Sequence, residues 1–202
     1  MVTMAKRYRA LLAFAFLPLL AHGQSPRDAF IAAAKSQVGV TTSYDGSYRR
    51  IAYPNGDVPL HTGVCTDVVI RAFRKVGVDL QVLVHEDMKR NFSAYPKRWG
   101  LRRPDTNIDH RRVPNLGTFF TRRGLALPVT ARAADYQPGD IVTWDLSSRV
   151  PHIGIVSNVR SGQRPLVVHN IGAGARQEDV LFAWKITGHY RWQFAATAPR
   201  RR

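Results

Sequence analysis

The stretch His61-Thr-Gly-Val-Cys-Thr-Asp-Val-Val-Ile70 carries Cys65, the only cysteine of the chain, and has the pattern of a helix that starts there. Apolar residues continue at helical spacing through Ala72 and Phe73, and Gly77 ends the segment. A cysteine at a helix N-terminus lies at the positive end of the helix dipole, which favours the thiolate. The alternative interpretation is a small buried side chain on a core helix.

Two histidines lie far downstream in segments of β character, Pro151-His-Ile-Gly-Ile-Val156 and Leu166-Val-Val-His-Asn170. A lone cysteine with distant histidines is typical of a nucleophile that works with a base and an orienting group. Because successive strand residues point to opposite faces, only one of His169 and Asn170 can face His152. We favour His169, and Asn170 is the alternative orienting residue.

Helices are predicted in the first half of the chain. One begins at Ser25-Pro-Arg-Asp28, one at Cys65, one after Asp79, and one spans about Asn115 to Arg123. Two long loops are expected, at residues 41–64 with a short strand near 50–53, and at residues 93–112 as a substrate-facing flap.

Strands are predicted in the second half, and short connections make them antiparallel. Their expected ranges are 141–145, 152–159, 166–170 and 186–192. Helices followed by an antiparallel sheet predict one α+β domain over residues 24–193, with a basic tail at 194–202.

The first 23 residues resemble a secretory signal. Three basic residues precede an apolar stretch, Ala10 to Ala21, that is too short to span a bilayer. Small residues at Ala21 and Gly23 predict cleavage before Gln24, and an uncleaved membrane anchor is the alternative. We therefore expect a periplasmic or secreted protein with no transmembrane segment after cleavage.

The chain is strongly basic, with a formal net charge of +16. Cleavage would lower this to +13, because residues 1–23 hold three basic residues and no acidic one. Such a surface favours anionic partners, and the predicted export argues against nucleic acid. We expect peptidoglycan or another anionic envelope polymer as partner and a monomeric protein. A free thiol in an oxidising compartment also favours a working cysteine.

The order of these motifs resembles the NlpC-type, papain-like cell-wall cysteine peptidases. The matching segments are the helix-borne Cys65, Pro138-Gly-Asp-Ile-Val142, His152-Ile-Gly-Ile-Val156 and Val167-Val-His169. Gly63-Val-Cys-Thr-Asp-Val-Val69 and Asn107-Ile-Asp-His-Arg-Arg-Val-Pro-Asn-Leu116 resemble an uncharacterised bacterial branch, a domain-of-unknown-function family. The usual Asp-Cys-Ser-Gly around the nucleophile is replaced here by Val64-Cys-Thr-Asp67.

The resemblance implies a papain-like fold and a cysteine amidase or endopeptidase that cleaves peptidoglycan stem peptides through a thioester. Cys65 would be the nucleophile, His152 would hold it as an ion pair and protonate the leaving amine, and His169 would orient His152. The Cys65 backbone N–H would stabilise the oxyanion. Substrate contacts are expected from Tyr53, Asn170 and Trp144. No cofactor or metal is expected, and Asp67 is expected to cap the helix.

Three other functions fit parts of the sequence. The same catalytic residues could hydrolyse or transfer lipid acyl groups. A degenerate peptidase fold could serve as a non-catalytic, cationic wall-binding protein. A zinc hydrolase could use His152, His169 and Asp140, but the sequence has no His-Glu-x-x-His or Cys-x-x-Cys motif.

Overall fold

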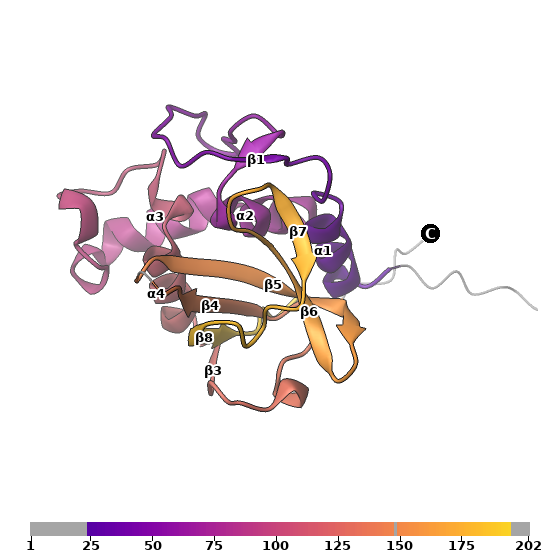
Figure 1. Ribbon diagram of the computed structural model, residues 1–202. Helices are drawn as coiled ribbons and strands as arrows, with labels where there is room; N and C mark the ends of the chain where they lie inside the picture. The colour runs from indigo at the N-terminus through magenta and orange to yellow at the C-terminus, as the bar shows by residue number, and fades with distance from the viewer. Residues whose placement is uncertain (1–23, 148, 195–202) are drawn as a thin grey trace, which may run out of the picture.

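Helices cover one face of an antiparallel sheet in the computed structural model, which describes residues 24–147 and 149–194 (Figure 1). The α+β class predicted from the sequence is therefore confirmed. None of the helices in these ranges has the length and apolar composition to cross a membrane. The predicted signal segment and residues 195–202 of the predicted tail lie outside the described residues.

All four predicted helices are present. Their bounds are α1 Pro26–Lys35, α2 Cys65–Lys75, α3 Leu80–Arg90 and α4 Val113–Arg122. Ser25 caps α1 by accepting a hydrogen bond from the Asp28 backbone N–H at 3.1 Å, and Asp79 caps α3 through the Gln81 N–H at 2.9 Å. The capping side chains thus fix where these two helices begin.

The main sheet has the strand order β3-β8-β4-β5-β6-β7, with every neighbouring pair antiparallel. The strands are β3 Ala126–Leu127, β4 Ile141–Asp145, β5 Pro151–Ser161, β6 Arg164–Asn170, β7 Ala175–Glu178 and β8 Lys185–Tyr190. The sequence predicted four of them and missed β3 and β7. These two edge strands are short, and β7 is largely polar, so they lack the alternating pattern of a half-buried strand.

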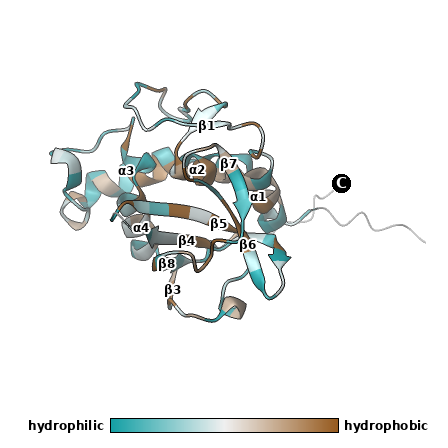
Figure 2. Ribbon diagram, viewed as in Figure 1, coloured by the Kyte–Doolittle hydropathy of each residue, from teal (hydrophilic) through white to brown (hydrophobic). Residues whose placement is uncertain are grey.

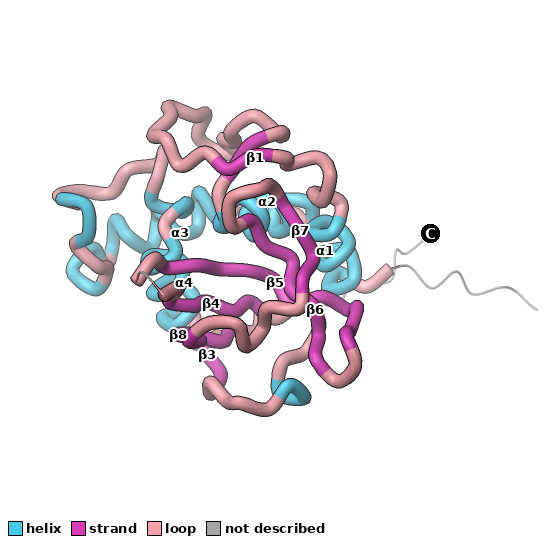
Figure 3. Tube along the Cα trace, viewed as in Figure 1, coloured by secondary structure: helices cyan, strands magenta, loops and turns pink. Residues whose placement is uncertain are grey.

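Two long connections, one between α1 and α2 and one between α3 and α4, lie outside the main sheet (Figure 3). In the first, β1 Ser43–Tyr44 pairs in parallel with β2 Thr62–Gly63. The predicted strand at residues 50–53 is wrong, because the backbone there bonds to a side chain: the Ala52 carbonyl accepts from Gln81 Nε2 at 2.8 Å. The second connection contains three short 3-10 helices, η1 Phe92–Ala94, η2 Arg98–Gly100 and η3 Asp109–Arg111, and a fourth, η4 Ala133–Asp135, precedes β4.

The main core lies between the helices and the sheet, and a smaller core lies on the other face (Figure 2). Ile153 and Val168 belong to the first, and Trp144 and Val167 to the second. Phe194 packs against Phe30, with ring centroids 5.3 Å apart. The packed domain therefore extends to residue 194, one residue beyond the predicted boundary.

Candidate active site

A buried ion pair fixes the N-terminus of α2, where Cys65 stands. The Asp67 carboxylate accepts hydrogen bonds from Nε and Nη2 of Arg111, both at 2.9 Å, and neither side chain is more than 4% exposed. Asp67 also accepts from the Val64 backbone N–H at 2.7 Å, which confirms it as a helix cap. Removing either charge would leave the other buried without its partner.

Asn170 holds the chain that leads into Cys65. Its amide donates to the backbone carbonyls of Gly63 at 3.1 Å and Ser43 at 3.3 Å, so it ties β6 to both β1 and β2. The side chain is completely buried. The structure therefore places Asn170 inside the fold, on the strand face opposite to His169.

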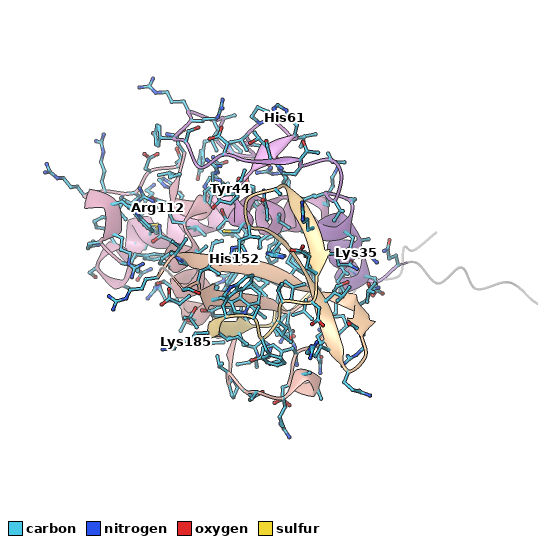
Figure 4. All side chains as sticks on the ribbon, viewed as in Figure 1. Lys35, Tyr44, His61, Arg112, His152 and Lys185 are labelled. Atoms are coloured by element: carbon cyan, nitrogen blue, oxygen red, sulfur yellow. The ribbon has the colours of Figure 1, made fainter. Side chains whose placement is uncertain are left out.

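The Cys65 side chain is 3% exposed and forms part of the wall of a cavity of about 380 Å³. The Tyr44 hydroxyl and the Ile153 backbone N–H both lie close to its sulfur. We call this space the Cys65 cavity. Its lining includes Tyr44, Tyr48, Trp99, Arg111, Arg112 and Pro151. Figure 4 shows Tyr44 between β1 and α2, and His152 on β5.

His152 and His169 meet on β5 and β6, as the sequence predicted. His152 Nε2 lies 2.9 Å from His169 Nδ1, and His169 Nε2 lies 2.9 Å from a Glu178 carboxylate oxygen on β7. Because an ionised carboxylate only accepts hydrogen bonds, His169 donates from Nε2 and accepts at Nδ1. His152 then donates from Nε2, which leaves its Nδ1 free to act as a base.

The Cys65 thiol and the His152 imidazole belong to opposite faces of β5. Cys65 packs in the core between the helices and the sheet, whereas the His152 ring packs against Trp144 in the smaller core. The β5–β6 register starts at Ile155 opposite Val168, so the two strands are not yet paired at His152. Ile153, whose backbone N–H lies close to the Cys65 sulfur, follows His152 directly, but successive strand residues point to opposite faces. No hydrogen bond joins Cys65 to the His152 ring among the described residues, and His152 is not among the lining residues of the Cys65 cavity, so the resting structure does not bring the thiol and the imidazole together.

Two tryptophans screen the histidine pair from water. The rings of Trp144 and Trp184 both lie 5.8 Å from the His152 ring, measured between centroids. Trp144 is 1% exposed and donates from Nε1 to the Leu181 carbonyl at 2.9 Å. This residue, expected to contact substrate, is thus placed as a buried cover for His152.

Burial keeps both reacting groups uncharged at rest. It raises the pKa of the Cys65 thiol to about 12, although the Ile153 N–H and the N–H groups at the helix start oppose this. Burial also lowers the pKa of His152 to about 3, with a smaller effect in the same direction from His169. At neutral pH the resting site therefore holds a thiol and a neutral imidazole, instead of the ion pair expected from the sequence.

Tyr53 lies outside this site. Its ring packs edge-on against His85 at 5.4 Å, it is 42% exposed, and it does not line the Cys65 cavity. Asp140 also lies elsewhere: its carboxylate pairs with His189 Nε2 and with Arg191, each at 2.7 Å. The three residues of the zinc alternative therefore do not converge.

Sequence reasoning missed Tyr44 and Glu178. Tyr44 lies in a loop rich in glycine and polar residues, where nothing distinguishes it from its neighbours. Glu178 reaches His169 only because β7 pairs with β6. The sequence Ala175-Arg-Gln-Glu178 has no pattern that predicts this strand.

The Cys65 cavity continues on two sides. Tyr48, Trp99, Ile108 and Arg112 also line a neighbouring cavity of about 650 Å³. Val113 and Pro151 also line a groove of about 670 Å³ between α4 and strands β4 and β8. The Cys65 cavity thus shares lining residues with two neighbouring spaces.

Known proteins resemble this chain over most of its length. The uncharacterized protein YijF of Escherichia coli (strain K12) is 57% identical over 161 residues, which cover 79% of this chain and 78% of YijF. Residues 31–192 match the family described as domain of unknown function DUF1287. This range includes Cys65, His152, His169 and Glu178, so the whole candidate site lies within the matched domain. The chain therefore belongs to the DUF1287 family.

Proposed function

We propose that this protein is an exported cysteine amidase or endopeptidase that cleaves amide bonds in peptidoglycan stem peptides. The observation that carries the proposal is a thiol at a helix start, on the wall of a cavity, in a domain whose sheet also holds the hydrogen-bonded series Glu178, His169, His152. A helix-borne cysteine packed on an antiparallel sheet that supplies the histidines is also the arrangement implied by the papain-like resemblance.

Acylation would begin with attack of the Cys65 sulfur on the carbonyl carbon of the scissile amide. For this step the His152 ring must turn from its packing against Trp144 toward the Cys65 side of β5. Because the resting groups are neutral, the thiol proton then moves to His152 Nδ1 as the C–S bond forms. The tetrahedral intermediate collapses when His152 returns this proton to the amide nitrogen, and the C–N bond breaks. The products of this step are a thioester on Cys65 and a free amine.

Deacylation reverses the roles. A water molecule gives a proton to His152 and attacks the thioester carbon, and the C–S bond breaks. His152 then returns the proton to the sulfur, and the carboxylic acid leaves. His169 and Glu178 keep the imidazole in one tautomer throughout, as the third member of a triad does.

Two donors are suitably placed for the oxyanion. One is the Cys65 backbone N–H at the start of α2, where the helix dipole also favours negative charge. The other is the Tyr44 hydroxyl, which lies close to the sulfur. An oxygen on the attacked carbon would lie close to both groups.

The substrate class rests on charge and shape. A formal charge of +13 after the predicted cleavage suits a polymer with free carboxylates, and the two spaces that adjoin the Cys65 cavity give room for a peptide chain. Arginine side chains line the cavity next to Cys65, whereas a lipid acyl chain would need an apolar groove there.

The test is digestion of purified sacculi by protein expressed from the full-length chain, with released fragments identified by mass. Wild type, Cys65→Ala and Arg160→Gln are compared, the last being an exposed arginine on the distant part of β5. We expect new fragments from wild type and Arg160→Gln and none from Cys65→Ala. Identical fragments from Cys65→Ala would refute the mechanism.

Other outcomes point to the alternative functions. Binding of wild type and Cys65→Ala to sacculi without cleavage by either would indicate a wall-binding protein. Neither cleavage nor binding would exclude the peptidoglycan substrate, and thioester trapping with acyl lipids would then test the lipid alternative.

A further inference from the structure

The cavity beside the Cys65 cavity is unusually rich in arginine. We call it the arginine hollow, after the four arginines in its lining: Arg50, Arg102, Arg103 and Arg112. Because Arg112 and Trp99 line both spaces, a ligand in the hollow lies directly next to a group that reacts with Cys65.

Most of the positive charge of the hollow is not neutralised within the described part of the chain. Arg50, Arg102 and Arg103 form no ion pair with a described carboxylate. Asp105 is the only acidic residue in the described lining, and its carboxylate already accepts hydrogen bonds from Tyr48 Oη at 3.0 Å and Asn107 Nδ2 at 2.9 Å. The hollow is therefore an anion-attracting site next to the thiol.

Arg112 is held in place at the junction of the two cavities. Its guanidinium lies over the Trp99 ring, 5.1 Å from the centroid. Its Nη1 is 3.6 Å from the Asp109 carboxylate, too far for a hydrogen bond, and this buried nitrogen has no hydrogen-bond partner among the described residues. Arg112 is thus oriented with donor capacity to spare.

Arg111, on the wall of the Cys65 cavity, has the same property. Asp67 uses its Nε and Nη2, but Nη1 is buried and bonds to no described atom. A buried donor without a partner costs about 1–3 kcal/mol, so two of them at one cavity need an explanation. The natural partner of a guanidinium fork is a carboxylate.

We propose that Arg111, Arg112 and the arginine hollow form a subsite for a free carboxylate of the substrate, next to the amide that Cys65 attacks. The preferred substrate is then an acidic peptide whose free carboxylate lies close to the scissile bond. This inference rests on the proposed function for the bond that is cut, but the subsite itself can be tested by binding alone.

The test is calorimetric titration of the Cys65→Ala protein, expressed from the full-length chain, with two synthetic probes. One is a stem tetrapeptide with free carboxylates, and the other is the same peptide with its carboxylates converted to amides. We expect the acidic peptide to bind at least about tenfold more tightly, because charged hydrogen bonds are the stronger ones. The preference should disappear with Arg112→Gln and shrink with the exposed double variant Arg102→Gln/Arg103→Gln.

Arg160→Gln is the matched control for loss of one positive charge, and it should keep the full preference. Three results would overturn the subsite: equal affinity for the two peptides, no binding of either peptide, or a preference that stays unchanged in all arginine variants. Inorganic phosphate binding as tightly as the acidic peptide would overturn its assignment to carboxylates. Cleavage of sacculi is measured separately. The subsite can therefore be refuted while the proposed hydrolase activity is confirmed, and the hydrolase activity can be refuted while the subsite is confirmed.

Discussion

At the scale of single residues, the Cys65 sulfur is a nucleophile in surroundings that keep the thiol protonated. The side chain is 3% exposed, and burial raises its thiol pKa to about 12, against an ordinary value near 9. The thiol is therefore poised to react only when a partner takes its proton.

The alkylation rate of the thiol follows from this environment. At pH 8 we expect iodoacetamide to modify Cys65 in the native protein at least about a hundredfold more slowly than in urea-unfolded protein, because the thiolate is the reactive form. Mass spectrometry over time measures both rates. A native rate equal to or above the unfolded rate would mean that the resting thiol is activated.

Tyr44 is the residue whose chemical role is most easily isolated. Tyr44→Phe removes the hydroxyl that lies close to the Cys65 sulfur and leaves the ring in place. If this hydroxyl stabilises the oxyanion, kcat should fall about 100-fold or more with little change in KM. Tyr53→Phe, on a ring outside the cavity, is the control and should retain activity. Unchanged kcat in Tyr44→Phe would leave the backbone N–H as the oxyanion donor.

At the scale of elements, β5 and β6 must lie close together for the histidines to meet. Gly154, on β5, makes this possible, because a Cβ there would stand 2.6 Å from Val167 Cγ1, 3.0 Å from the Val168 carbonyl oxygen and 3.1 Å from His169 Cβ. The glycine is thus required by cross-strand packing beside the candidate site.

Gly154→Ala should destabilise the fold by about 1–3 kcal/mol and lower activity as well, because the added methyl group displaces His169. Urea unfolding and sacculus digestion measure the two effects. Gly162→Ala, in the turn of the same hairpin, meets nothing within 4 Å but has φ +56°, so it should affect stability by backbone strain alone and keep activity. Full activity and stability in Gly154→Ala would contradict the packing argument.

The connection between α2 and η3 depends on one buried charge pair. Arg111→Met leaves the Asp67 carboxylate buried without its guanidinium, which should cost roughly 3–5 kcal/mol in the free energy of unfolding. The double variant Asp67→Leu/Arg111→Met should lose less than the sum of the single variants, as urea unfolding would show. Additive losses would mean that the two side chains do not interact.

At the scale of the whole molecule, buried neutral histidines make stability depend on pH. Burial lowers the pKa of His110 and of His152 to about 3, and it lowers that of His169 while Glu178 opposes the effect. The unfolded chain binds these protons near pH 6.5 and the folded chain does not, so folding is favoured above that pH.

Stability should therefore fall as the pH drops from 7.5 to 5, by up to about 1.4 kcal/mol per pH unit for each such histidine. Asp109, whose pKa burial raises to about 6, has the opposite sign and offsets part of the loss above its unfolded pKa. Thermal unfolding across this range measures the slope, and His110→Gln should reduce it. A stability that does not change between pH 7.5 and 5 would contradict the buried, neutral state.

The sequence predicted the secondary structure best where local chemistry decides it. Apolar residues at helical spacing identified α2, and Ser25 and Asp79 marked the starts of two helices because their side chains cap them. Alternation along β5 and β6 located these two neighbouring strands of the sheet. The same alternation allowed only one of His169 and Asn170 to face His152, and His169 does.

The sequence by itself determined the helix-borne Cys65, the strands that carry His152 and His169, and the α+β class, because these depend on the periodicity of nearby residues. Only the tertiary structure decided that Tyr44 instead of Tyr53 reaches the sulfur, that Glu178 completes the histidine series, and that burial leaves the thiol neutral. Those facts depend on contacts between segments far apart in the chain and on the exclusion of water. Neither leaves a pattern in the local sequence.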